Sequence, residues 1–339
     1  MLQFENKSPF AVAMSILPNR DGIDTLFVVV KATFNLVPSL AVAEKQVPVA
    51  MADEHWGDPA KTSVKYGSEL HLGKPGTDII LVGQAWAPQQ RPVTETGAML
   101  RVADRKKTIV AVGDRVWRGN SPSSPKPFVS MPLVFERAYG GSHQVGDRLY
   151  CEEQNPVGVG FVGKRSKSDL AGQPVPNLED LHKRIGSLGD VVPPVCFGFV
   201  APSWQSRRQY AGTYDETWQK TRAPYLPKDF DLRYFHAATR DFVFPQPLVG
   251  GEPIAVAGVA PEGPLRFELP KCRLDLQVTL AGKKVTPSPP SLETVVIEPD
   301  ENRVCLSWRS QLACDKQPLK VEKVHVDVAE LTISQKAVR

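Results

Sequence analysis

The chain has 339 residues, of which 42% are hydrophobic and 23% are charged, and its formal net charge is +4. This composition is ordinary for a globular protein, and no stretch approaches the roughly 20 apolar residues that a membrane-spanning helix needs. The net charge is small for this length, and the densest basic cluster is the short run Arg105–Lys107. The composition therefore gives no indication of nucleic-acid binding.

The cysteines, the histidines and the first residues argue against further classes of protein. The five cysteines form no Cys-x-x-Cys pair and are odd in number, which favours reduced thiols over a disulfide framework. The six histidines do not have the short spacings of zinc sites, so we predict no metal and no cofactor. The N-terminal segment lacks the basic start and the unbroken apolar run of a secretion signal. We therefore expect a cytoplasmic protein.

The first part of the chain is dominated by predicted strands. Apolar residues alternate along Leu26–Leu36, which predicts a half-buried strand. Asp78–Trp86 predicts a second strand that is more fully buried. Ala98–Ala103 and Thr108–Val112 predict an antiparallel pair joined by a basic turn at Arg105–Lys107.

The pattern is more irregular in the middle of the chain. Leu133–Tyr139 still predicts a strand. Asn177–Ser187 predicts a short helix, with its first residue as the N-cap. Thr213 and Glu216 have the Thr-x-x-Glu spacing of a capping box, which predicts a helix over about Tyr214–Thr221.

Strands return in the last hundred residues. Cys272–Leu280 has the cleanest alternation of apolar and polar residues in the sequence. Thr294–Ile297 and Val304–Trp308 predict a hairpin, and Val321–Ile333 predicts a long, bulged final strand. The sequence thus favours a mainly β fold, with a two-lobed antiparallel β-sandwich-like architecture and a few short helices in the central segment.

Three regions are expected within this fold. Residues 1–140 form an N-terminal β lobe, residues 141–240 an irregular central segment with short helices, and residues 241–339 a C-terminal β lobe. The three regions are expected to form one continuous structural unit.

The segment Arg207–Phe235 is the densest group of aromatic, proline and charged residues, and we expect any site to lie there. Its two carboxylates Asp229 and Asp231 are interpreted as hydrogen-bond acceptors for backbone amides in a turn. Trp218 is interpreted as a packing residue. The candidate structural or partner-binding residues of the whole chain are Glu136, Arg137, Arg207, Asp215, Trp218, Asp229 and Asp231.

These candidates suggest internal charge pairs. We expect the arginines to order the centre of the chain by pairing with its carboxylates, a buried arrangement in which the loss of one partner costs about 3–5 kcal/mol. The arginines are Arg137, Arg207 and Arg208, and the carboxylates are Asp215, Asp229 and Asp231.

A carbohydrate-active hydrolase is the alternative function. No Gly-x-Ser-x-Gly motif indicates a serine nucleophile. A β scaffold, six tryptophans and several central carboxylates would nevertheless suit glycoside hydrolysis, which needs an acid and a base at a defined separation. The carboxylates from which such a pair could be drawn are Glu136, Asp215, Glu216, Asp229 and Asp231.

A series of short motifs in a fixed order is similar to one bacterial family. The motifs are Lys31–Phe34, Lys74–Asp78, Gly113–Trp117, Met131–Leu133, Phe135–Gly141, Asn155–Phe161, Pro176–Glu179, Gly212–Trp218, Leu226–Asp231, Val295–Ile297 and Ser307–Arg309. In this order they resemble an uncharacterised domain family encoded in type VI secretion clusters, beside genes for the VgrG spike, PAAR-tip proteins and toxic effectors. One departure is Tyr139, where the family pattern tends to Phe.

The resemblance covers nearly the whole chain and carries an expectation of function. It implies a cytoplasmic accessory protein, an adaptor or chaperone that helps to seat an effector on the VgrG or PAAR spike. It implies no catalytic residue. Exposed strand edges are candidate sites for partner contact, because an unpaired edge can accept a strand from another chain.

Overall fold

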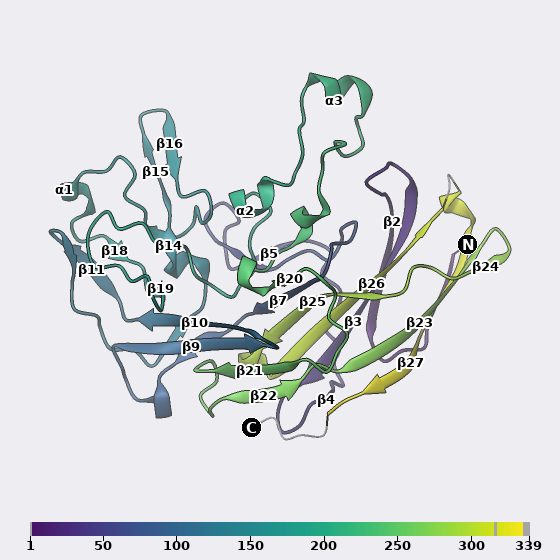
Figure 1. Ribbon diagram of the computed structural model, residues 1–339, viewed down its shortest axis with the longest axis horizontal. Coiled ribbons are helices and arrows are strands. Elements are labelled where there is room, and N and C mark those ends of the chain that lie inside the picture. Colours follow the sequence, from purple (N-terminus) through teal and green to yellow (C-terminus); the bar gives the residue numbers. More distant parts are fainter. Residues whose placement is uncertain (1, 315–316, 335–339) are drawn as a thin grey trace.

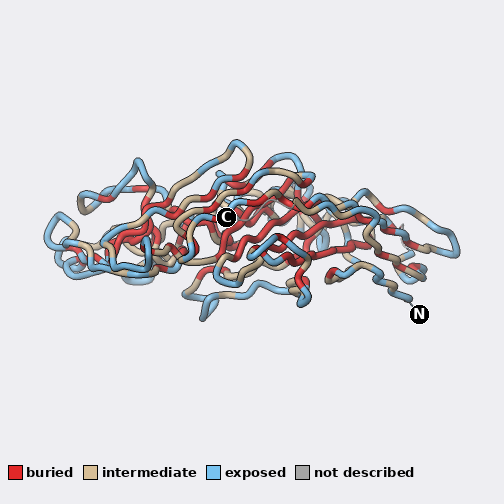
Figure 2. The backbone as a smooth tube through the Cα atoms, turned by 90° about the horizontal axis from the view of Figure 1, so that it is seen from below, coloured by how far each residue is buried: buried red, intermediate tan, exposed pale blue. Residues whose placement is uncertain are grey.

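The computed structural model describes residues 2–314 and 317–334. Strands in several mainly antiparallel sheets are the main regular structure of the described residues, whose α-helices are three short ones. A seven-stranded and a four-stranded sheet lie in one half of the molecule, and long strands of a five-stranded sheet, small sheets and loops lie in the other half (Figure 1). Buried backbone runs along the middle of this elongated body (Figure 2). The predicted mainly β class is confirmed.

The largest sheet, which we call the main sheet, combines strands from distant parts of the sequence. Its order is β2-β3-β26-β25-β7-β20, with β4 beside the end of β3. Neighbouring strands are antiparallel except β25 and β7, which are parallel. The strands are β2 (Ala11–Pro18), β3 (Asp24–Asn35), β4 (Ala41–Val42), β7 (Thr77–Leu81), β20 (Val243–Phe244), β25 (Ser291–Glu298) and β26 (Arg303–Ala313).

A four-stranded sheet lies next to the main sheet, in the order β1-β27-β23-β24. The alternation predicted for Cys272–Leu280 is confirmed, because Leu274 and Leu276 are buried while Arg273 and Asp275 are exposed. The predicted bulges of the final strand are confirmed by two register shifts against β23. The strands are β1 (Gln3–Asn6), β23 (Lys271–Leu280), β24 (Lys283–Val285) and β27 (Val321–Thr332).

Strand β3 is buried on both faces, so its prediction as half-buried is wrong. Val28 and Val30 on one face share a hydrophobic core with buried residues of β23 and β27. Lys31 and Thr33 on the other face are covered by polar partners. An alternating sequence predicts one buried and one exposed face. When both faces are covered, residues of both faces are buried.

A five-stranded sheet in the order β19-β10-β9-β21-β22 contains the predicted antiparallel pair. The predicted turn is wrong, because Arg105–Lys107 belong to β10. The chain turns instead at Ala103–Asp104, where Ala103 has a positive φ of 50°, as tight hairpins require. The strands are β9 (Glu95–Val102), β10 (Arg105–Val112), β19 (Leu178–Asp180), β21 (Pro253–Ala257) and β22 (Leu265–Glu268).

Two further strand predictions have different outcomes. The hairpin of β25 and β26 is confirmed, with a turn at residues 299–302. The predicted strand Asp78–Trp86 is divided, because β7 ends at Leu81 and β8 (Gln84–Trp86) pairs with another strand. Its predicted full burial holds for β7.

Short strands and turns fill the rest of the described chain. A second, smaller hydrophobic cluster around Trp117 and Tyr139 lies among them. The strands are β5 (Glu54–His55), β6 (Val64–Tyr66), β11 (Arg115–Arg118), β12 (Ser121–Pro122), β13 (Ser130–Pro132), β14 (Tyr139–Gly140), β15 (Ser142–Val145), β16 (Arg148–Cys151), β17 (Val159–Gly160) and β18 (Pro174–Val175).

The helices of the described residues are all short. The α-helices are α1 (Lys167–Leu170), α2 (Gln205–Arg208) and α3 (Glu216–Thr221). The 3-10 turns are Pro88–Gln90, Phe135–Arg137, Leu232–Phe235, Arg240–Phe242, Pro299–Glu301 and Pro318–Lys320. Within residues 2–314 and 317–334, none of the helices has the length and apolar character needed to cross a membrane.

Two predictions in the centre of the chain are wrong. Leu133–Tyr139 is not a strand, because Phe135–Arg137 forms a 3-10 turn. Asn177–Ser187 is not a helix, because β19 begins at Leu178 and pairs with β10. The Asn177 amide does not cap a helix but donates to the carbonyl of Val112 at 2.9 Å. Tertiary pairing has overridden the local capping signal.

The predicted helix at residues 214–221 is present as α3, but its cap is a different residue. Asp215 accepts a hydrogen bond from the backbone N–H of Trp218 at 2.8 Å. The Thr213 hydroxyl donates to Asp229 at 2.8 Å instead. Both residue types are good N-caps, and the long-range contact with Asp229 decides between them.

Candidate functional site

A pocket of about 580 Å³ lies on the face of the main sheet that Lys31 occupies. We call it the sheet pocket. Its floor is built from alternate residues of neighbouring strands, which point to the same face. Its walls come from residues 47–54, residues 66–71 and part of the segment 199–237. The floor residues are Lys31, Thr294, Val296, Glu298, Arg303 and Cys305.

A buried ion pair joins the floor of the pocket to its wall. Lys31 Nζ lies 2.9 Å from Glu69 Oε2, and both side chains are about one-tenth exposed. The backbone N–H of Ala50 donates to the same oxygen at 2.8 Å, and the Ser307 hydroxyl donates to Oε1. Glu69 therefore connects β3, β26 and two covering segments.

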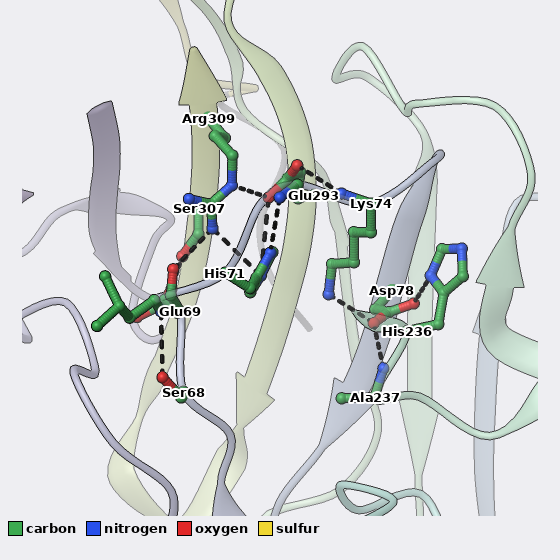
Figure 3. Close-up of polar contacts among 12 residues, drawn as sticks. Ser68, Glu69, His71, Lys74, Asp78, His236, Ala237, Glu293, Ser307 and Arg309 are labelled. Atoms are coloured by element: carbon green, nitrogen blue, oxygen red, sulfur yellow. Dashed lines mark hydrogen bonds and ion pairs between the residues drawn. The ribbon is translucent and has the colours of Figure 1, made fainter. Parts of the chain in front are cut away.

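A second buried pair, Arg309 with Glu293, lies beside Glu69 of the first pair (Figure 3). Arg309 Nε donates to Glu293 Oε2 at 2.8 Å, and Arg309 Nη2 donates to the Glu69 carbonyl at 2.7 Å. His71 lies against Arg309 and stacks on Phe235 with ring centroids 5.1 Å apart. Burial, together with the nearby charges of Arg309 and Lys74, holds the pKa of His71 well below its usual 6.5. The ring is therefore neutral at neutral pH.

The third buried group is centred on Asp78 at the start of β7 (Figure 3). Its carboxylate accepts from Lys74 Nζ at 2.6 Å, from the backbone N–H of Ala237 at 2.7 Å, and lies 2.7 Å from His236 Nδ1. Burial alone would raise the pKa of Asp78, but Lys74 and His236 outweigh it and lower the pKa to about 2. Asp78 thus ties the segment around residue 236 to the main sheet.

The fourth group lies on the pocket floor. Arg303 Nε donates to Glu298 Oε2 at 2.7 Å, and the Tyr66 hydroxyl donates to Glu298 Oε1 at 2.6 Å. Burial, followed by the hydrogen bond to Glu298, raises the pKa of Tyr66 above its usual value. All of these groups are paired, as buried charges must be.

Arg207, a predicted candidate, lines the sheet pocket from α2. Its Nε donates to the carbonyl of Tyr234 at 2.8 Å and its Nη1 to the carbonyl of Val200 at 2.9 Å. The guanidinium also lies 5.4 Å from the centroid of the Tyr234 ring. Burial lowers the pKa of Arg207. Within the described chain it forms no ion pair, so its predicted pairing with an aspartate is wrong.

Two other candidates lie away from the sheet pocket. Glu136 accepts from the backbone N–H and the hydroxyl of Ser63, at 2.7 and 2.8 Å. Arg137 donates to Asn177 Oδ1 at 3.1 Å and lies 3.3 Å from Asp114. Its expected pairing with residues 215, 229 or 231 is wrong, because both of its partners belong to the β10–β19 side of the molecule.

The remaining candidates lie on the arm that carries α3 and at its base. Asp229 and Asp231 accept from the backbone N–H groups of Thr213 and Arg233, at 3.0 and 2.9 Å, as their interpretation as turn residues predicted. The indole N–H of Trp218 donates to the carbonyl of Tyr225 at 2.8 Å. These contacts are local, and the arm is also joined to Arg20 in the β2–β3 turn, whose Nη2 donates to the carbonyl of Lys228 at 3.0 Å and whose carbonyl accepts from Arg222.

Asp215 and Arg208 are the last two residues of the predicted charge pairs. Asp215 is used as the α3 cap, and the ion-pair partner of Arg208 is Glu153, at 3.1 Å. The expected pairing of Arg208 with a central aspartate is therefore wrong. None of the five carboxylates considered for a hydrolase, all within the described chain, lines the sheet pocket.

Most of the residues that build the sheet pocket were missed as site candidates. The available signal was a charged residue inside an apolar strand, as with Lys31 in β3 and Glu293 in β25. Charged residues are almost never fully buried unless they are paired, so each such position predicts a partner from elsewhere. The sequence does not say which partner, because the partners of these two lie 38 and 16 residues away.

The sheet pocket contains mostly paired charges. Its buried carboxylates are already engaged by cations or backbone N–H groups. Among the described residues, no group of three or more His, Cys, Asp or Glu side chains is placed to hold a metal ion. Among the described residues that line the pocket, the apolar wall and Arg207, which forms no ion pair, stand outside this network of paired charges.

The fold and the site define a mainly β protein with a network of paired charges buried on one sheet face. Residues 21–309 match the model of the bacterial family described as "Uncharacterized protein conserved in bacteria (DUF2169)". This match covers most of the chain, and the protein belongs to that family. No curated protein and no solved structure matches the chain.

Proposed function

We propose that the protein is a type VI secretion accessory protein, an adaptor or chaperone that helps to load an effector onto the VgrG or PAAR spike in the cytoplasm. The ordered motifs that resemble the family of type VI secretion clusters support this function. Catalysis is not part of the proposal. An adaptor of this kind needs a surface that binds another polypeptide.

The outer edge of β2 supports the proposal. β2 is the terminal strand of the main sheet, and among the described strands only β3 pairs with it. Its eight residues, AVAMSILP, contain no charged side chain, and its register with β3 is unbroken. Proteins usually protect such edges with charges, bulges or an internal proline. β2 has its proline only at its end.

The hydrogen-bonding groups at this edge can be assigned from the adjoining turn. Asn19 donates to the carbonyl of Ile23 at 2.8 Å. Because hydrogen-bonded and non-bonded pairs alternate along an antiparallel ladder, alternate residues from Leu17 back to Ala11 bond to β3. The main-chain groups of Val12, Met14 and Ile16 then point away from the sheet. A partner segment adds to these groups as a further strand.

The test is a pull-down with the effector, the VgrG protein and the PAAR protein encoded beside this gene. We expect the wild-type protein to recover the effector or a spike protein. Met14→Pro removes an outward N–H without breaking a bond to β3. It should reduce recovery by about tenfold, because one main-chain hydrogen bond to the partner is then left unmade. Met14→Ala is the matched control, because it shortens the side chain and keeps the N–H.

Two outcomes would count against the proposal. If the wild-type protein recovers none of the three proteins, the adaptor function is wrong. If Met14→Pro and Met14→Ala both bind as well as wild type, the partner does not use the β2 edge. Thermal unfolding of both variants shows whether the fold is retained.

A further inference from the structure

The sheet pocket has the size and lining of a ligand site. Its volume of about 580 Å³ lies within the range of known small-molecule pockets, which are mostly apolar with a few placed polar groups. The apolar part of its wall is formed by Val47, Pro48, Val49, Met51, Leu70 and Phe199. A ligand with an apolar body would therefore be covered on one side by hydrocarbon.

The cations of the pocket are paired with carboxylates except at one position. Among the described residues that line it, four are cations. Lys31, Lys74 and Arg303 each contact a carboxylate, at 2.9, 2.6 and 2.7 Å. Arg207, the fourth, forms no ion pair with a described residue: its guanidinium donates to backbone carbonyls and lies over the Tyr234 ring. The charges of Asp53 and Asp78 act on it only from a distance, partly offsetting the lowering of its pKa by burial. His71 adds no charge, because its pKa is well below its usual value.

The Arg207 guanidinium is fixed by hydrogen bonds within the protein. Two of its nitrogens donate to carbonyls on different segments, so the side chain is already ordered before anything binds. Its Nη2 has no hydrogen-bond partner among the described residues. A partly buried guanidinium gains strongly from a carboxylate, since hydrogen bonds between charged groups are about twice as strong as neutral ones.

The remaining carboxylates of the pocket limit the charge of the ligand. Asp53 and Glu54 also line it and are exposed. Asp53 accepts from the backbone N–H of Ser68 at 2.7 Å, and Glu54 lies 3.7 Å from Lys65. A ligand with two or more negative charges would meet these carboxylates with only one available cation. A single carboxylate suits the site better.

We infer that the sheet pocket binds a monocarboxylate with an apolar body, whose carboxylate contacts Arg207 Nη2. The ligand is either a free small acid or the C-terminal end of a peptide, because both present the same chemistry. This inference does not depend on the β2 edge, and it assigns the pocket a role beyond stabilising the fold.

The experiment is isothermal titration calorimetry at pH 7 with two pairs of probes. One pair is decanoate and decanol. The other is the tripeptide N-acetyl-Leu-Leu-Phe with a free C-terminal carboxylate and the same peptide as an amide. We expect the carboxylate of at least one pair to bind about tenfold more tightly than its neutral counterpart. If decanoate and decanol show this difference, the ligand is a free small acid. If the two peptides show it, the ligand is the C-terminal end of a peptide.

Variants locate the binding site. Arg207→Gln should abolish the difference between the carboxylate and the neutral probe. Arg208→Gln is the matched control, because it removes the same charge from the next residue of α2, whose side chain is 57% exposed, and it should bind as wild type. Ala52→Trp, which places a larger side chain on the pocket lining and leaves Arg207 itself unchanged, should weaken both members of the binding pair.

Three results would overturn the inference. They are equal affinity of wild type for carboxylate and neutral probes, no binding of any probe at millimolar concentration, and an equal loss of binding in Arg207→Gln and Arg208→Gln. If Arg207→Gln does not fold, the comparison of probes on wild type and the Ala52→Trp variant still decides the matter.

Discussion

The sheet pocket and the α3 arm, residues 211–229, contain similar residues in opposite surroundings. In the pocket, the Lys31–Glu69 pair is 10% and 9% exposed. On the arm, which projects from the body in Figure 1, the Lys220–Glu216 pair is 72% and 86% exposed. Water can replace the partner of an exposed charge but not that of a buried one. The same pair of residue types therefore contributes very differently to stability.

The largest expected effect is at Asp78. Asp78→Asn leaves Lys74 buried without a counter-charge, and we expect the free energy of unfolding to fall by about 3–5 kcal/mol. Urea unfolding measures this change. Asp229→Asn on the arm is the control and should cost less than about 1 kcal/mol. If the free energy of unfolding falls equally in Asp78→Asn and Asp229→Asn, buried and exposed charges contribute equally to stability and the comparison of the two regions is wrong.

The Lys31–Glu69 pair tests whether the cost comes from an unpaired charge. Lys31→Met alone should cost about 3 kcal/mol, because Glu69 stays buried without a cation. Adding Glu69→Gln should recover part of this loss, since the amide carbonyl can still accept from Ala50 and carries no charge. Lys220→Met on the arm should change stability by less than about 0.5 kcal/mol. A double variant less stable than Lys31→Met would contradict this explanation.

Acidification should weaken the pocket region through His71. The pKa of this residue is lower in the folded state than in the unfolded chain. Below about pH 6.5 the unfolded state therefore binds a proton that the folded state does not. His71 lowers the free energy of unfolding by up to about 1.4 kcal/mol per pH unit in that range. Urea unfolding between pH 7.5 and 5 should show a shallower pH dependence for His71→Gln. Identical slopes would argue against a buried neutral ring.

The smallest effect is expected at the α3 cap. Asp215→Ala should cost about 1 kcal/mol and should act mainly on the helix, which hydrogen exchange at the Trp218 amide reports directly. Thr213→Ala should leave that amide nearly as protected as in wild type, because the Thr213 hydroxyl bonds to Asp229. If Thr213→Ala lowers the protection of the Trp218 amide more than Asp215→Ala does, Thr213 is the cap.

Residue patterns predicted the strands whose two faces differ. Cys272–Leu280 has one face in the core and one in water, and the sequence alternates accordingly. The hairpins of β9 with β10 and of β25 with β26 were predicted from two apolar runs on either side of a turn, although β25 and β26 are buried on both faces. The pattern was misleading for β3, where both faces are covered, and for Asn177, whose amide bonds to a residue 65 positions away. The division into lobes at residues 140 and 240 stays a prediction.

The candidate site was predicted only where its chemistry was local. Asp229 and Asp231 bond to backbone amides as their residue type suggests, and Arg207 was identified as a candidate without its real partners. The pocket itself was not predicted, because its floor and walls come from segments as far apart as residues 31 and 305.

The sequence by itself determined that the chain is mainly β, where many of its strands lie, and that its acidic turn residues serve the backbone. These properties depend on the alternation of side chains and on hydrogen bonds between near neighbours. Only the tertiary structure decided which charges are buried, which partners neutralise them and that Arg207, among the described residues lining the sheet pocket, forms no ion pair. The physical reason is that the energy of a charge depends on its distance from other charges and from water, and folding sets both.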